Sequence, residues 1–599
     1  MVRLAILLQI QYMKFAKGIL FCLAITATFG FTSLMEDPIP YKKFGYTPQQ
    51  AAARLLDRFS FGAKPGQVEA VVNIGLENWL EQQFAANQPN IALEKRLSNF
   101  KSLSLSNDTI VNTYLNAGQV IRLATRKGII NRDSIKGDQK EYREQVRVIM
   151  EQEGYKPIQE LHRELVNQKV LSAAYSNNQL QEVLTDFWFN HFNVSVTKNQ
   201  CQQYVYTYER DAIRPNVMGR FKDLLLATAQ HPAMLEYLDN ASSVSIKNQP
   251  RSNMAAPRNA RGLNENYARE VMELHTLGVD GGYTQADVTT VAKALTGWTV
   301  MPLAKDAPAR NLLERLNPAQ LERGGFVMKG DFLFRADQHD NEAKIILNKN
   351  FPANGGYQEG IDVLTMLAEH PSTAKFICTK LATRFVSDTP SVSLIKNMVK
   401  TFLSTDGDIK AVLRTMVYDP AFWKKSVSHE KIKSPFEMVI SAVRATNAQV
   451  IQPFQLFNWC TKMGQRFYYY QAPTGFPDRA SNWINTGALL NRMNFGLAFA
   501  SQKIPGVRMD LAALNNYHEP ESAIDALTVY SNILLPQRDH AANIKRLIPL
   551  VNDDAVEEKI SKAATVDKTA EQMILDKGTK NMLSQVVGII IGSPEFQRK

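Results

Sequence analysis

The stretch that decides the fold is TPQQAAARLLDRFSFGAKPGQVEAVVNIGLENWL, residues 47–80. Thr47 followed by Pro48 is typical of a helix start, because a threonine side chain can cap the first turn and proline fits the first helical position. Apolar residues then recur at spacings of three and four, which is the period of one helix face. Pro65 begins a second such pattern, Gly75 ends it, and a third follows at once. The stretch therefore predicts three consecutive helices, each with one apolar face.

The same helical pattern continues through nearly the whole chain. Residues 326–334 (FVMKGDFLF) differ, because Lys-Gly-Asp between two apolar triplets is typical of a small β-hairpin. The segment before them, residues 302–325, has the composition of a surface insertion. No linker rich in Pro, Gly or Ser divides residues 46–599. We therefore expect a mainly α protein with one large multi-helix body over 46–599 and a minor hairpin; the alternative is two lobes that meet near 300–355.

A helix joint recurs along the chain, in which a polar residue and a proline precede a new helix. The polar residue is His231, His370, Asp419 and Ser593 in turn. Asp and Ser are ordinary helix caps, and proline fits the first helical position. The two histidines are therefore predicted to cap helices.

The composition is that of an ordinary globular protein. The 599 residues are 45% hydrophobic and 21% charged, which excludes wholesale disorder and fibrous repeats. Lys and Arg exceed Asp and Glu by 69 to 58, a surplus of 11. Such a mild surplus favours anionic partners without demanding them. We find no nucleic-acid-binding motif and no long basic run, so nucleic acid is not an expected partner.

Residues 1–34 are typical of a secretory signal peptide. Lys14 and Lys17 precede a short apolar run, and small or hydroxyl residues follow it. Met13 is an alternative start of the chain. An uncleaved anchor is the other interpretation, but the apolar run is short for a membrane span. The segment predicts export to the periplasm or the outer surface, and the sequence suggests no other transmembrane span.

Three cysteines follow the signal peptide, at Cys201, Cys378 and Cys460. Three is an odd number and no C-x-x-C pair occurs, so one disulfide is possible and a disulfide scaffold is excluded. Cys378 lies on an apolar helix face and is expected to be a small buried residue.

Familiar catalytic motifs do not occur in a supporting context. G-x-S-x-G, H-E-x-x-H, the P-loop and G-x-G-x-x-G are the signatures of common serine hydrolases, zinc proteases, NTPases and dinucleotide enzymes. Their absence from the sequence counts against these classes and leaves less familiar sites open.

The densest polar cluster contains Glu270 and Glu273, which are three residues apart and share one helix face. A pair of carboxylates can bind a divalent metal or act as acid and base. We therefore name both as candidate catalytic residues and metal ligands. His275 is a third candidate, although it lies about 200° round a helix from Glu273 unless the helix ends there. The alternative is a solvated face on which Arg269 pairs with Glu273.

Two further segments carry candidate residues. His191, in DFWFNHFNV, is a candidate base or ligand, or else a buried histidine with a satisfied hydrogen bond. His339 and Asp340 open the loop HDNEAK (339–344), where they could bind a metal or act as an acid–base pair. Lys344 of that loop could hold an anion. An ordinary polar loop is the alternative.

These segments together resemble the bacterial domain-of-unknown-function 1800 family. The resemblance covers nearly the whole mature chain, and Val271 stands where the family commonly has leucine. It implies a large, often exported bacterial protein, and it implies no reaction and no catalytic residues. Besides HD…K at 339–344, the segments that carry it are AARLLDRFSFGAKPGQVEAV (52–71), LTDFWFNHFNV (184–194), GRFKDLLLATAQHPAMLEYLDN (219–240), NENYAREVMELHTLGVDGGYTQADVTTVAKALTGWTV (264–300), EHPSTAKFICTKLATRFVSD (369–388), KIKSPFEMV (431–439), PTGFPDRASNW (473–483) and SPEFQ (593–597).

Two hypotheses of function follow, and the sequence leaves open whether the protein is an enzyme. The first is an enzyme that acts on cell-envelope or extracellular polymer, with or without a divalent metal held by Glu270 and Glu273. Its candidate catalytic residues are Glu270, Glu273, His275, His191, His339 and Asp340. The second is a non-catalytic protein that binds a glycan or another exported protein through exposed aromatics at 467–470 (FYYY), for which core packing is the alternative.

Overall fold

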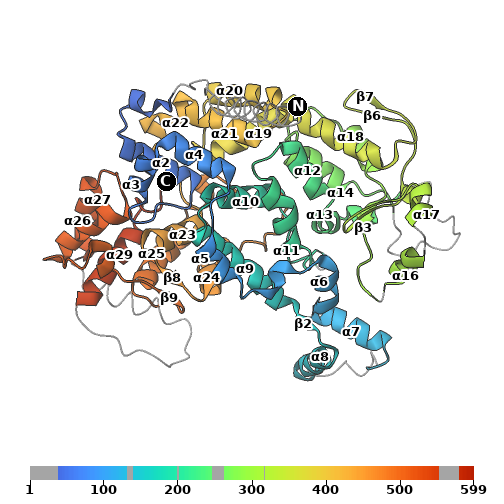
Figure 1. Cartoon of the computed structure of the whole chain (residues 1–599), viewed down its shortest axis with the longest axis horizontal. Helices are drawn as coiled ribbons and strands as arrows, with labels where there is room; N and C mark the ends of the chain where they lie inside the picture. Colours follow the sequence, from blue (N-terminus) through green and yellow to red (C-terminus); the bar gives the residue numbers. More distant parts are fainter. Residues whose placement is uncertain are drawn as a thin grey trace, which may run out of the picture. The chain divides into compact units, whose positions relative to one another are not determined.

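A computed structural model describes residues 38–130, 139–198, 201–245, 262–305, 307–315, 318–551 and 579–599. The predicted signal peptide lies outside the described residues. The chain from Tyr41 to Lys599 forms one compact unit, and the elements from α2 onward belong to it (Figure 1). Within the described ranges, none of the helices combines the length and the apolar character that crossing a membrane requires.

The predicted mainly α architecture is confirmed. The N-terminal helices are α2 (Pro48–Phe59), α3 (Gln67–Ile74), α4 (Leu76–Ala85), α5 (Ile91–Leu97) and α6 (Asn107–Thr113). The first three are the helices that residues 47–80 predict. Thr47 caps α2 as expected: its hydroxyl accepts a hydrogen bond from the Gln50 backbone N–H at 3.2 Å, and the Gln50 side chain accepts one from the Thr47 N–H at 3.1 Å.

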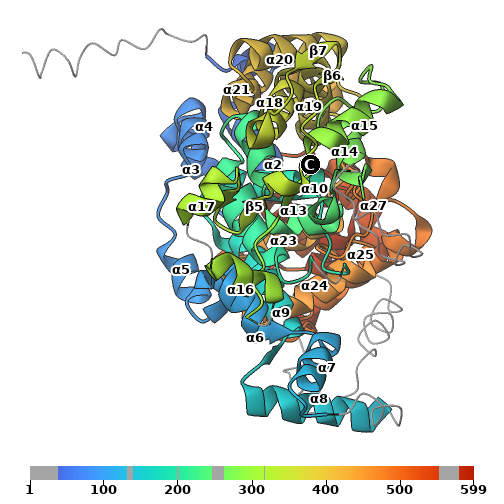
Figure 2. The same ribbon diagram turned by 90° about the vertical axis from the view of Figure 1, so that its right-hand side faces the viewer.

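A small helical layer projects from the rest of this unit. It consists of α7 (Ala117–Arg126) and α8 (Gln139–Glu153), and both views place it at the end opposite to α18 and α20 (Figure 2). Its own apolar core contains Leu115, Val120, Ala124, Val146, Ile149 and Met150. Two short parallel strands, β1 (Tyr114–Leu115) and β2 (Lys156–Pro157), join it to the following helix.

The centre of the fold is built on two long helices, α9 (Ile158–Tyr175) and α10 (Gln179–His191). Helix α9 packs against α23 and α24, which come more than two hundred residues later in the sequence. The other helices of this middle part are α11 (Val205–Thr207), the π-helix η4 (Tyr208–Ile213), α12 (Phe221–Ala229), α13 (Pro232–Tyr237), α14 (Asn266–Glu270), the π-helix η8 (Val271–His275) and α15 (Gln285–Ala294).

The strands form small sheets within the described residues. The predicted hairpin is confirmed as β4 (Val327–Lys329) and β5 (Phe332–Phe334), an antiparallel pair in which Val327 lies opposite Phe334. Strand β3 (Trp298–Val300) pairs with the other edge of β5. The insertion before the hairpin contains α16 (Pro308–Arg315) and α17 (Pro318–Arg323), and the remaining strands are β6 (Lys344–Ile346), β7 (Lys349–Phe351), β8 (Gln449–Val450) and β9 (Val507–Arg508).

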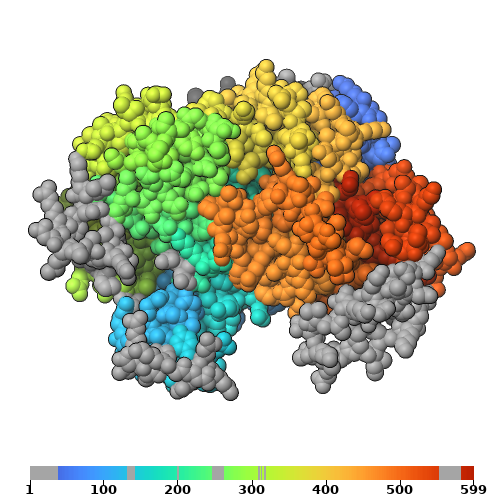
Figure 3. All heavy atoms as spheres, turned by 180° about the vertical axis from the view of Figure 1, so that it is seen from behind, coloured from blue at the N-terminus to red at the C-terminus, as the bar shows by residue number. Residues whose placement is uncertain are grey.

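The second half of the chain adds two helical layers. The first contains α18 (Gly356–Glu369), α19 (Pro371–Phe385), α20 (Val392–Ser404), α21 (Ile409–Tyr418) and α22 (Pro420–Trp423). The second contains α23 (Pro435–Ala445), α24 (Pro453–Lys462), α25 (Thr486–Ala500), α26 (Ala523–Leu534), α27 (Ala541–Val551) and α29 (Thr579–Gly592). Figure 3 shows this C-terminal layer as adjoining orange and red surfaces. Helices α25 and α29 pack at glycines, since a Cβ at Gly496 would lie 2.6 Å from the Gly588 carbonyl oxygen.

The predicted helix joints are confirmed at three of their four positions. The Nδ1 atoms of His231 and His370 accept hydrogen bonds from the backbone N–H groups of Ala233 and Ser372, both at 3.1 Å. Asp419 caps α22 in the same way. All three cysteines, Cys201, Cys378 and Cys460, are free and buried, so the single disulfide that their number allows is not formed.

Candidate functional site

The acidic pair of the sequence analysis lies at the junction of α14 and η8. Glu270 and Glu273 are half-buried, and burial together with the charge of Glu273 raises the pKa of Glu270. Arg269 pairs with Glu265 at 3.2 Å, and not with Glu273 as in the alternative interpretation of a solvated face. In the described part of the chain, no three His, Cys, Asp or Glu side chains gather where they could hold a metal ion. Among the residues that the structure describes, the pair therefore has no third ligand of these types beside it.

His275 points away from the acidic pair and meets His191. The side chains are 1% and 2% exposed, their ring centroids are 6.0 Å apart, and the Nε2 of His191 lies 3.0 Å from the His275 carbonyl oxygen. Burial, with a smaller contribution from the charge of Lys380, lowers the pKa of His275 to about 3 and also lowers that of His191. Both rings are therefore neutral at pH 7, packed among aromatic side chains such as Phe192.

His339 and Asp340 belong to a third, separate group. His339 contacts Glu359 at 3.2 Å through Nε2 and the Thr296 carbonyl oxygen at 2.9 Å through Nδ1. The ammonium of Lys344 lies 2.9 Å from Glu359 and 3.4 Å from Asp340. All these side chains are buried. The group therefore fastens the loop and β6 to α18, and Lys344 holds carboxylates of its own chain in place of an external anion.

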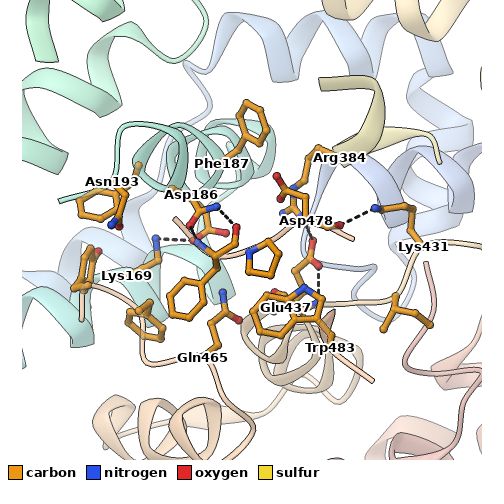
Figure 4. A pocket seen from close by; sticks show the side chains of 18 residues that line it. Lys169, Asp186, Phe187, Asn193, Arg384, Lys431, Glu437, Gln465, Asp478 and Trp483 are labelled. Atoms are coloured by element: carbon orange, nitrogen blue, oxygen red, sulfur yellow. Dashed lines mark hydrogen bonds and ion pairs between the residues drawn. The ribbon is translucent and has the colours of Figure 1, made fainter. Parts of the chain in front are cut away.

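A different set of residues surrounds a charged cavity in the centre of the fold (Figure 4). Its free volume of about 40 Å³ exceeds the roughly 10–15 Å³ that one water requires, so it admits water or a small chemical group. The figure shows Lys169 and Asp186 on one side and Arg384 and Lys431 on the other. The lining residues are Lys169, Asp186, Phe187, Phe189, Asn190, Asn193, Arg384, Lys431, Ile432, Ser434, Glu437, Gln465, Phe467, Tyr468, Phe476, Pro477, Asp478 and Trp483.

Lys169 of α9 is the central cation of the first side. Its ammonium lies 2.9 Å from Asp186 of α10 and 3.7 Å from Glu209. Burial by itself lowers the pKa of Lys169, but the two carboxylates outweigh it and the pKa is raised. Four aromatic rings surround the ammonium at 5.3–5.9 Å, from Phe189, Phe436, Phe467 and Tyr468. Lys169 is thus a fixed charge that holds the Asp186 carboxylate at the cavity wall.

Arg384 of α19 and Glu437 of α23 form the second charged pair. They lie 2.5 Å apart, and the Lys599 ammonium also contacts Glu437. Burial would raise the pKa of Glu437, but the two cations outweigh it and hold the pKa well below its usual range. Burial likewise lowers the pKa of Arg384, whereas Glu437, Asp186 and Asp478 outweigh it and raise the pKa. Arg384 therefore faces carboxylates from three separate segments.

The outer wall of the cavity is the loop 473–478. The Asn190 side chain fixes it, because its amide donates to the Phe476 carbonyl and its oxygen accepts from the Phe476 N–H, both at 2.7 Å. Gly475 is required for this approach: its φ is 68°, and a Cβ there would lie 2.1 Å from the Asn190 carbonyl oxygen. The carbonyl of Asp478 accepts from Lys431 at 2.9 Å, and Lys431 also pairs with Asp388. The loop thus holds Asp478 at the edge of the cavity.

Two polar groups of the cavity have no hydrogen-bond partner among the described residues, and the first of them is fully buried. The Nη2 of Arg384 is buried without a hydrogen-bond partner. The Asp478 carboxylate is half-buried and accepts no hydrogen bond from any described residue. Buried polar groups normally find partners, because leaving one unpaired costs about 1–3 kcal/mol. A ligand or ordered water in the cavity would supply what they lack.

The aromatic run 467–470 forms part of this wall. Phe467 and Tyr468 are buried, and the Tyr468 hydroxyl donates to Glu209 at 2.6 Å. This placement agrees with the core-packing interpretation of the run and leaves only its second half, Tyr469 and Tyr470, half-exposed.

The sequence did not reveal the charged cavity. The candidate residues that it did indicate lie in three other groups: the acidic pair, the two buried histidines, and the group of His339 and Asp340. The cavity residues have no informative spacing, since Lys169, Asp186, Arg384, Glu437 and Asp478 come from five segments. The family resemblance was the one feature of the sequence that could have pointed to the cavity. Of the segments on which the family resemblance rests, 184–194, 369–388, 431–439 and 473–483 all contribute to this cavity.

The comparisons with known proteins agree with that resemblance. The family described as "Protein of unknown function (DUF1800)" matches residues 54–598, nearly the whole chain. No curated protein and no solved structure matches the chain. Since the match extends from α2 to the last residues after α29, the chain belongs to the DUF1800 family.

Proposed function

We propose that this protein is an exported enzyme that hydrolyses a cell-envelope or extracellular polymer by acid–base chemistry in the charged cavity. The observation that carries the proposal is the convergence of three carboxylates and three cations from distant segments on one small cavity. Burying so many charges is costly and adds little to stability, so such clusters are common at functional sites. The signal peptide expected at residues 1–34 supports export.

In this reaction Asp186 is the general base. Its carboxylate, paired with Lys169, takes a proton from a water as the water oxygen bonds to the electrophilic carbon of the substrate. The proton that Asp186 has taken then passes, through a water held by the Asp478 carboxylate, to the leaving oxygen as the old bond breaks. The free Nη2 of Arg384 stabilises the negative charge that develops between them.

The size of the cavity limits how the substrate lies. About 40 Å³ holds a reacting group and a water, but not a polymer segment. The polymer would therefore lie across the mouth at Pro477 and Asp478, with one bond presented to the interior.

Cleavage assays on a panel of envelope polymers test this proposal. Asp186→Asn and Asp478→Asn should each lower the rate by about 10²–10⁴, the usual contribution of general acid–base groups. Asp280→Asn, the same change at an exposed position, is the matched control. Full activity in both cavity variants, with their fold intact, would overturn the proposal.

The metal-assisted version at Glu270 and Glu273 is a separate proposal. Elemental analysis of protein purified without chelators tests it directly. About one divalent metal per chain, lost in Glu270→Ala/Glu273→Ala, would move the site to the acidic helix. No bound metal would leave the acid–base cavity as the better candidate.

A further inference from the structure

A second hollow lies in the projecting layer, outside the charged cavity. It is a groove between α6, α7 and the turn that follows α8, closed on one side by Ala304 and Lys305. Its free volume of about 510 Å³ falls within the roughly 300–1,000 Å³ of ordinary ligand sites. The lining residues are Val111, Asn112, Leu115, Gln119, Arg122, Leu123, Arg126, Lys127, Glu153, Gly154, Tyr155, Ala304 and Lys305.

The groove is strongly basic. Four cations and one carboxylate line it, which leaves a net charge of +3. The carboxylate, Glu153, is already paired with Lys127. Arg122 is exposed and has no hydrogen bond or ion pair with any described residue. Arg122 and Arg126 are four residues apart on α7, so they share one helix face.

We infer that this groove binds an anionic glycan, a polysaccharide whose charge comes from carboxylate or sulfate groups. Its volume exceeds what a single small anion would occupy, and guanidinium groups match carboxylate and sulfate oxygens with paired donors. Tyr155 is half-buried and lines the groove, so its aromatic ring lies beside the charged side chains. A glycan is favoured over nucleic acid because residues 1–34 have the pattern predicted for a secretory signal peptide and the sequence has no nucleic-acid-binding motif.

The groove is placed to hold such a polymer near the cavity. The turn that contains Tyr155 leads through the short strand β2 into α9, and Lys169 lies eleven residues after the first residue of that helix. At 1.5 Å per residue this is about 16 Å along the helix axis. The inference concerns binding alone, so it stands or falls separately from the proposed hydrolysis.

Calorimetric titration of the mature chain tests the inference with four probes: polygalacturonate, dextran sulfate, uncharged dextran and single-stranded DNA. We expect binding to at least one of the two anionic glycans, no binding to dextran, and affinity that falls as salt rises from 50 to 200 mM. Whichever anionic glycan binds more tightly identifies the favoured charged group.

Arg122→Glu should weaken glycan binding by tenfold or more. Lys396→Glu, on the exposed face of α20 far from these lining residues in the sequence, is the matched charge reversal and should change affinity by less than threefold. Circular dichroism checks that both variants are folded. Equal affinity of Arg122→Glu and the parent, tighter binding to DNA than to either glycan, or equal binding to uncharged dextran would each overturn the inference.

Discussion

The charged cavity and the acidic face at α14 and η8 place carboxylates in opposite situations. In the cavity, Glu437 is 5% exposed and contacts two cations that come from other segments. At the acidic face, Glu270 and Glu273 are half-buried neighbours in sequence, and neither forms an ion pair with a described residue. The carboxylates that lie close in sequence thus form a half-buried helix face, whereas the charges buried by long-range pairing line the cavity that we propose as the site.

The same substitution in both regions tests this difference, and the cavity should give the largest effect. Glu437→Gln leaves Arg384 and Lys599 buried beside a neutral amide, so it should lower the free energy of unfolding by about 3–5 kcal/mol. Urea denaturation measures the change. A loss below about 1 kcal/mol would mean that the cavity ions are hydrated and that the two regions do not differ.

Gly475→Ala tests whether the cavity wall depends on the close approach of its loop. The added Cβ would lie 2.1 Å from the Asn190 carbonyl oxygen at a backbone φ of 68°. The loop must therefore move, and we expect a cost of about 1–3 kcal/mol together with lost activity. Gly487→Ala is the matched control, because its added Cβ meets only a side-chain oxygen at 3.6 Å. Equal stability of the two variants would contradict the described loop.

His275 extends the comparison to pH. The unfolded chain protonates this imidazole near pH 6.5, whereas the folded protein does so near 3. Between these values the unfolded state binds the extra proton, so the residue makes stability fall on acidification by up to about 1.4 kcal/mol per pH unit. His275→Gln should therefore reduce the slope of unfolding free energy against pH by up to this amount between pH 6 and pH 4. Above pH 7 the two curves should run parallel; equal slopes below pH 6 would contradict the neutral buried ring.

Glu273→Gln should give the smallest effect. It removes a negative charge whose repulsion contributes to the raised pKa of Glu270. We expect a stabilisation of at most about 0.5 kcal/mol at pH 7 and a lower pKa of Glu270, which NMR titration can follow. A loss of more than 1 kcal/mol would show that Glu273 has a structural or metal-binding partner.

Local features of the fold could be predicted from the sequence, because their causes are local. Helices α2 to α4 follow from apolar spacing and from caps such as Thr47, and the hairpin follows from Lys-Gly-Asp at 329–331. The π-helix at Val271–His275 was not predictable from spacing. Nor was the contact of His275 with His191, a residue eighty-four positions away, because it depends on tertiary packing.

The candidate site was much less predictable. His339 was recognised from the neighbouring Asp340, yet its closest carboxylate belongs to Glu359, twenty residues later. Arg384 of α19 meets Glu437 of α23 across fifty-three positions of the sequence, and Lys599 reaches Glu437 from the last position. Ion pairs of this kind depend on tertiary packing, which no spacing in a single sequence encodes.

The most direct test is a side-by-side cleavage assay of Asp186→Asn and the double variant Glu270→Gln/Glu273→Gln on the polymer that the parent cleaves best. Both variants remove carboxylates, and both are first shown to be folded. We predict a loss of at least 100-fold for Asp186→Asn and activity within threefold of the parent for the double variant. Full activity of Asp186→Asn, with activity lost in the double variant, would contradict the account and place the reaction at the acidic helix.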